Sequence, residues 1–194
     1  EDMSLPIEGV AHNISVVKIK NSYPGNAYKV MNALWGAGQM MFNKIMIAVD
    51  GDVDIHNPIP LVQKISRNVN PAKDIFFSKG PLDVLDHASD QPCFGSKIFI
   101  DATSKNAKES AQIPSIDGER VAEELSPLPQ GVSAYNTSLL SMGISILLIS
   151  VDKTEIKNLK ELSSRLFRLN SFRYISAIVF VDKEVDVSNM PLVV

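Results

Sequence analysis

The first half of the chain alternates between short apolar runs and segments whose apolar residues recur at helical spacing. Residues 14–20 and 44–50 are two such runs, rich in β-branched side chains and only partly alternating, which is typical of strands covered on both faces. Between these runs, apolar residues at helical spacing predict a helix over residues 27–40. A second helix is expected to begin near Pro58 or Pro60. The element order at the start of the chain is therefore β-α-β-α.

Two shorter strands are predicted at residues 74–77 and 97–101, with no helical segment between them. A sheet that contains both is expected to be mixed, because a parallel pair needs a long crossover connection. Beyond them the composition changes, and residues 102–138 are polar and interrupted by three prolines. One short helix is predicted there, over residues 118–125. We interpret residues 106–138 as a linker or lid.

A further β-α-β unit is predicted near the end of the chain. Its strands are expected at residues 143–151 and 173–181, and its helix carries an apolar face from Ile156 to Leu169. The unit ends at residues 191–194, at the point where the first one continues into its second helix. We therefore expect the chain to be cut short.

This last unit repeats the first. Residues 49–55 match residues 181–187 at an offset of 132, and residues 14–19 match residues 144–149 at an offset of 130. The matches fall at strand centres and in an acidic loop, which favours internal duplication over convergence of two ordinary β-α-β units.

These patterns predict a three-layer α/β domain with one central, mixed sheet, built from the two duplicated β-α-β units and covered by helices on both faces. Residues 1–105 are expected to form the core with the first copy. Residues 106–138 would be a linker or lid of the same domain, and residues 139–194 the second copy.

Composition narrows the functional classes. A hydrophobic content of 45% in 194 residues suffices for a core, and a net charge of −3 without a basic block argues against nucleic acid as a partner. The single Cys93 excludes an internal disulfide and fits a reducing, cytoplasmic location. The longest apolar stretch, residues 142–151, is about half of a membrane-spanning helix, so no transmembrane segment is expected.

Local motifs give no complete catalytic set. Asp50, Asp52 and Asp54 alternate as in a calcium loop, but the glycine and glutamate that such a loop needs later are missing, so an exposed structural loop is favoured. His87 follows two aspartates in a turn-rich loop, and a carboxylate could orient its imidazole. A histidine that only hydrogen-bonds its own loop is the favoured interpretation.

Several separate segments, at consistent spacing, carry a more specific likeness. They are residues 9–19, 22–31, 42–45, 52–54, 80–88 and 95–103. In this order they resemble the C-terminal part of the UbiD family of decarboxylases, with the closest likeness to members associated with quinone biosynthesis. The resemblance extends over about residues 5–105.

The resemblance implies decarboxylation of an aromatic or α,β-unsaturated acid with prenylated FMN and manganese. In that family the flavin-binding domain, the metal ligands and the catalytic carboxylates precede the matched region. No catalytic, cofactor-binding or metal-binding residue is therefore expected in this chain, which alone would bind no cofactor and be inactive. The implied partners are the upstream flavin-binding domain, other subunits of a homo-oligomer and a small-molecule acid.

By the same resemblance, Met41, Gly80 and Leu82 fall at positions that line the substrate pocket. Where relatives carry a basic residue near the cofactor phosphate, this sequence has Gly38, so no phosphate contact is transferred. An aliphatic Met41 and Leu82 suit a wall that excludes water from a carbanion-like reaction. One alternative for Met41 and Leu82 is that they are ordinary core residues. The alternative for the whole domain is a non-catalytic assembly module.

Overall fold

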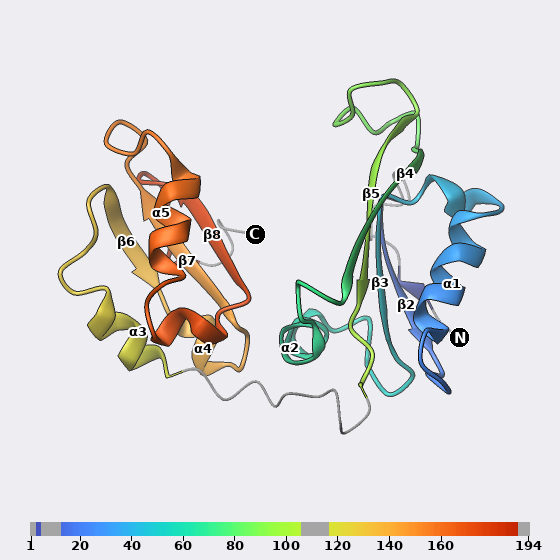
Figure 1. Ribbon diagram of the computed structural model, residues 1–194, viewed down its shortest axis with the longest axis horizontal. Coiled ribbons are helices and arrows are strands. Elements are labelled where there is room, and N and C mark those ends of the chain that lie inside the picture. Colours follow the sequence, from blue (N-terminus) through green and yellow to red (C-terminus); the bar gives the residue numbers. More distant parts are fainter. Residues whose placement is uncertain (1–2, 5–12, 106–116, 190–194) are drawn as a thin grey trace. The chain divides into compact units, whose positions relative to one another are not determined.

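The computed structural model describes residues 3–4, 13–105 and 117–189. It divides into two compact units, residues 1–111 and 112–194, and each is described by itself. Figure 1 shows the elements of both.

Unit 1 is built on a five-stranded mixed sheet. Its strand order is β1-β2-β3-β5-β4, with β2, β3 and β5 parallel and the edge strands β1 and β4 antiparallel to their neighbours. The strands are β1 (Met3–Ser4), β2 (Ile14–Ile19), β3 (Ile45–Asp50), β4 (Ile75–Pro81) and β5 (Phe94–Asp101). The predicted mixed sheet is confirmed in this unit.

Helices cover both faces of this sheet (Figure 1). They are α1 (Asn26–Trp35), the short 3-10 helix η1 (Gln39–Phe42) and α2 (Pro58–Asn68). Because side chains alternate across a strand, Val17 and Met46 pack under α1 while Val16 and Val49 belong to the cluster on the α2 side. Unit 1 is therefore a three-layer α/β domain.

Unit 2 has a three-stranded sheet in the order β6-β7-β8, in which β7 is antiparallel to β6 and parallel to β8. Its elements are α3 (Gly118–Glu124), β6 (Val132–Asn136), α4 (Ser138–Ser141), β7 (Ile146–Val151), α5 (Leu159–Leu166), η2 (Ser171–Tyr174) and β8 (Ala177–Asp182). One core joins Val121 of α3, Leu162 of α5 and the inward side chains of β7, including Leu147.

The two units share a repeat at a constant offset of 132 residues. This offset relates β2 to β7, η1 to η2 and β3 to β8 along their whole lengths. It also preserves the pairing register, since Ile14 lies opposite Ile45 and Ile146 lies opposite Ala177. The short β1 has its counterpart within β6, because Met3 pairs with Val17 as Tyr135 pairs with Ile149. The predicted offset of 130 for the first strand is wrong.

The prediction of one central sheet for both copies is also wrong, although the mixed α/β class is confirmed. Residues 118–136, interpreted as linker, supply α3 and β6. Strand β6 occupies one edge of β7 and β8 occupies the other, so β7 pairs within unit 2 and not with a strand of unit 1. The remaining part of the predicted linker, residues 106–116, lies outside the described residues.

Candidate functional site

The three predicted pocket residues lie at one end of the unit 1 sheet, where β3 and β5 begin and the antiparallel β4 ends. Met41 is half-buried in η1, Gly80 is buried near the end of β4, and Leu82 follows that strand. The Leu82 side chain has no exposed surface. We call this group the amino-end site.

A buried lysine joins the two segments that carry these residues. Lys97 of β5 is 3% exposed, and its ammonium donates hydrogen bonds to the carbonyl oxygens of Met41 and Pro81, the latter at 2.9 Å. The same Nζ lies 5.2 Å from the centroid of the Trp35 ring. Two carbonyl dipoles and an aromatic face therefore surround the charge.

The environment of Lys97 is unusual for a cation. None of the ion pairs found among residues 13–105 involves it. Burial lowers the pKa of its ammonium from 10.5 to about 8. Because its donors face carbonyl oxygens and the Trp35 ring, the group holds main-chain segments in place.

A second lysine holds the loop between β4 and β5. Lys44, just before β3, forms a 2.8 Å ion pair with the nearly buried Asp86 and donates to the Ala88 carbonyl at 3.1 Å. Hydrogen bonding from Lys44 is the main cause that lowers the pKa of Asp86. Asp86 is therefore engaged by Lys44, while the neighbouring His87 is exposed.

The interior of this loop is filled by Leu82. Its backbone N–H donates to the Cys93 carbonyl at 2.9 Å, which closes the loop. A Cβ atom added at Gly95 would lie 2.8 Å from Leu82 Cδ1 and 3.0 Å from Ser89 Cβ. Glycine at position 95 is therefore what allows the Leu82 side chain to lie against β5.

Sequence reasoning missed Lys44 and Lys97. The available signal was Lys97 in the otherwise apolar predicted strand 97–101. Side chains two residues apart in a strand point to the same face, so Lys97 lies on the face of the buried Phe99. A charged side chain there must find buried partners. The sequence alone does not show that those partners are carbonyl oxygens of two distant segments.

The acidic loop after β3 is structural, as favoured. The Asp50 carboxylate accepts hydrogen bonds from the backbone and hydroxyl of Ser104 and forms a 2.9 Å ion pair with Lys64. Burial raises the pKa of Asp50, but the bonds from Ser104 and Lys64 together hold it below its ordinary value. Asp54 accepts a bond from the His56 backbone.

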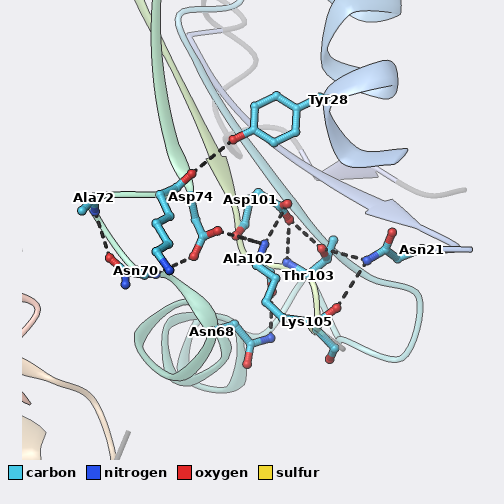
Figure 2. Close-up of polar contacts among 12 residues, drawn as sticks. Asn21, Tyr28, Asn68, Asn70, Ala72, Asp74, Asp101, Ala102, Thr103 and Lys105 are labelled. Carbon is cyan, nitrogen blue, oxygen red and sulfur yellow. Dashed lines mark hydrogen bonds and ion pairs between the residues drawn. The ribbon is translucent and has the colours of Figure 1, made fainter. Parts of the chain in front are cut away.

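A second polar cluster lies at the opposite end of the same sheet (Figure 2). The Lys105 ammonium lies 2.8 Å from Asp101 and 3.3 Å from Asp74, while Asp101 also accepts bonds from the backbone and hydroxyl of Thr103. Asn21 donates to the Thr103 hydroxyl at 3.1 Å. These groups border an open cavity of about 320 Å³. They satisfy one another, so the cluster ties the loops after β2 and β5 together.

Within the part of the chain that the structure describes, no group of three or more His, Cys, Asp or Glu residues is arranged to hold a metal ion. No helix there is long and apolar enough to cross a membrane.

Unit 1 thus has the architecture of a mixed α/β domain whose amino-end loops are held by the buried Lys97 and the partly buried Lys44. Residues 1–102 match the family model described as the 3-octaprenyl-4-hydroxybenzoate carboxy-lyase C-terminal domain, UbiD. This match covers more than half of the chain, so the chain belongs to that family.

The chain is also similar to individual proteins and solved structures. An uncharacterized protein of Archaeoglobus fulgidus is 42% identical over 105 residues, which are 54% of this chain and 22% of the relative. The closed form of Sedimentibacter hydroxybenzoicus vanillic acid decarboxylase is 30% identical, with a TM-score of 0.47 over 59% of this chain and 26% of that one. HmfF of Pelotomaculum thermopropionicum, a UbiD-class enzyme solved with FMN, is 22% identical with a TM-score of 0.44, over 57% of this chain and 25% of that one. The chain spans about a quarter of the length of these proteins.

Proposed function

We propose that this chain is the C-terminal domain of a UbiD-type decarboxylase that acts on an aromatic or α,β-unsaturated acid in quinone biosynthesis. The match of residues 1–102 to the carboxy-lyase C-terminal domain family is the observation that carries this proposal. Since the relatives are about four times longer than the matched segment, we place the flavin-binding domain and the catalytic carboxylates upstream. The single cysteine supports a cytoplasmic location.

The proposed division of labour follows from what this chain offers. Prenylated FMN, when bound, supplies the electron sink for decarboxylation. The amino-end site contributes an apolar wall from Met41, Gly80 and Leu82, which orients the acid and excludes water. The fixed position of the segments that carry all three residues supports this role. The full burial of the Leu82 side chain fits the alternative that Leu82 is ordinary core.

We propose that this chain does not itself bind the two cofactors. Position 38 is a glycine with a φ of 64°, so no side chain there can reach a phosphate. The described ranges hold no group of three or more His, Cys, Asp or Glu residues arranged for a metal ion. We propose that manganese is held by the upstream domain. The function proposed for this chain is to shape the pocket.

An assembly role has its own supporting observation. Large apolar side chains are exposed along β4, the following loop and the start of β5; they are Phe76, Phe77, Val84, Leu85 and Phe94. Because side chains alternate across a strand, Phe76 and Phe77 lie on opposite faces of β4. We propose that exposed apolar side chains of this hairpin pack against the upstream domain or another subunit of a homo-oligomer. The alternative function, a non-catalytic assembly module, depends on the same exposed side chains.

Comparison of the 194-residue chain with the full-length protein tests the proposal. The full-length protein, loaded with prenylated FMN and manganese, should release CO2 from an aromatic or α,β-unsaturated acid. The chain alone should bind the flavin weakly or not at all and should show no turnover. Turnover by the chain alone would contradict the placement of the catalytic residues. An inactive full-length protein without a flavin-binding domain would favour the assembly module.

A further inference from the structure

Hydrogen bonds from Lys97 join the two segments that carry Met41 and Gly80. Both segments leave regular structure at the amino end of the sheet, one through η1 and the other through the end of β4. The η1 helix contacts β4 directly, and Lys97 lies on β5, the sheet neighbour of β4. The Lys97 ammonium donates to the carbonyl oxygen of Met41 and, at 2.9 Å, to that of Pro81.

Lys97 has little freedom to do anything else. Its side chain is 3% exposed, and the Trp35 ring, 5.2 Å from Nζ, borders the ammonium. A Cβ atom at Gly80 would lie 3.3 Å from Lys97 Cδ, so the lysine stem lies against the Gly80 backbone. An ammonium has three N–H donors, and two carbonyl oxygens with one aromatic face match them.

Both bonds are made to main-chain oxygens. They therefore fix backbone positions whatever the neighbouring side chains are. Bonds from a charged donor are roughly twice as strong as neutral ones, and a buried cation that loses its partners is costly. Separation of the two segments would leave the charge of Lys97 with one acceptor, so the bonds oppose their separation.

We propose that Lys97 is a positioning residue that sets the width of the substrate pocket by tying the Met41 segment to the Gly80–Leu82 segment. This inference rests on the proposed function for its kinetic consequence, but the tie itself is a property of the 194-residue chain. Lys97 contacts neither substrate nor cofactor in this proposal. It acts through the two backbone segments that it joins.

The first arm of the test uses hydrogen exchange on the 194-residue chain, which needs no cofactor. Lys97→Met keeps the length and the apolar stem but removes every donor, and Lys79→Met on the exposed surface of β4 is the matched control. We expect at least a 10-fold faster exchange in residues 39–43 and 81–94 together in Lys97→Met. Exchange in α2 should change less than 3-fold, and the control should match the wild type.

The second arm uses the full-length enzyme and the ratio of kcat/KM for a bulky acid to that for a small one. Lys97→Met should raise this ratio at least 5-fold, because the gap is no longer held, and should raise KM for the small acid more than it lowers kcat. Lys97→Arg, which keeps donors and charge, should restore most of the wild-type ratio. A purely structural role would lower activity on both acids equally.

The outcomes separate the two proposals. Faster exchange in only one segment, or uniformly through unit 1, would overturn the tie even if the enzyme is active. An unchanged ratio in an active enzyme would overturn the positioning role. If the wild-type enzyme shows no decarboxylation, the proposed function fails while the exchange result still decides the tie. Should Lys97→Met not fold, Lys97→Gln, which retains one amide donor group, takes its place with the same criteria.

Discussion

The carboxylate of Asp86 and the ammonium of Lys44 lie 2.8 Å apart, although 42 residues separate them in sequence. Asp86 is almost fully buried, and it also accepts a 2.9 Å bond from the Ala88 backbone. Lys44 precedes β3 directly, so the pair fastens the β4–β5 loop to the start of a central strand. The loop that carries Leu82 is therefore held at two places, by Lys44 and by Lys97.

Asp86→Asn should weaken this attachment. It should also remove the part of the unfolding free energy that the wild type loses as pH falls. Lys44 lowers the pKa of Asp86 below 3.8, so the folded state binds a proton less readily than the unfolded state. The stabilisation is fully present above the unfolded pKa and is lost as pH falls through the lower folded pKa. We expect a loss of about 1–3 kcal/mol at pH 7, between the values for exposed and buried pairs.

Urea unfolding of the wild type and the variant at pH 7 and pH 3 measures this effect. The difference between the two proteins should shrink at pH 3, because below pH 3.8 the unfolded chain binds a proton at Asp86 more readily than the folded chain does. Asp90→Asn, an exposed change in the same loop, is the control. A difference that stays constant with pH would show that the ion pair does not set the stability of the loop.

Gly95→Ala should destabilise unit 1 through a clash with Leu82. The added Cβ would lie 2.8 Å from Leu82 Cδ1, and overpacking of this kind costs about 1–3 kcal/mol. Gly51→Ala is the control, since the nearest atom to its Cβ is 3.9 Å away. The double variant Gly95→Ala with Leu82→Ala should lose less unfolding free energy than the sum of the two single variants, by at least about 0.5 kcal/mol. Strict additivity in denaturant unfolding would rule out this contact.

Alkaline pH should reveal the burial of Lys97. Its pKa is lowered from 10.5 to about 8, so between these values the unfolded chain holds more protons than the folded one. The free energy of unfolding of the wild type should therefore rise relative to that of Lys97→Met as pH increases from 8 to 10.5. Lys79→Met, with an exposed lysine, should follow the wild type. Parallel curves for wild type and Lys97→Met would contradict the burial of the charge.

The fold of unit 1 was largely predictable because its signals are local. Strands β2 and β3 coincide with the predicted apolar runs to within a residue at each end, and α2 begins at Pro58, one of the two predicted starts, Pro58 and Pro60. There the Asn57 side chain accepts the Ile59 N–H at 3.2 Å. Helix α1 ends at Trp35 instead of extending to residue 40, because Gly36 caps it and Gly38 adopts a φ of 64°.

The sheet assignment failed where the information is not local. Strand β6 is a five-residue segment with mixed polarity that follows two prolines, and only its pairing with β7 makes it a strand. Because β6 was not predicted, β7 was expected to pair with a strand of the first β-α-β copy. The Lys97 bonds are equally non-local, since they join positions 41, 81 and 97 through backbone atoms that carry no sequence signal.

Leu82→Ala separates a pocket residue from an ordinary core residue. The side chain has no exposed surface, so its truncation should cost about 2–5 kcal/mol of stability in either case. The difference lies in specificity. If Leu82 shapes the wall over the substrate, its loss enlarges the pocket and raises kcat/KM for a bulky acid relative to a small one in the full-length enzyme. If it only fills the β4–β5 loop, that ratio stays at the wild-type value.

Two measurements on the same preparation decide the point: the melting temperature and the two values of kcat/KM at a temperature where both proteins are folded. Val121→Ala in unit 2 is a suitable control, because this side chain is also fully buried and lies outside the amino-end site. It should lower the melting temperature without changing the ratio. A shift of the ratio in Leu82→Ala but not in Val121→Ala would place Leu82 at the substrate. Equal ratios in all three proteins would assign Leu82 to the core of the loop and leave Met41 and Gly80 as the proposed wall.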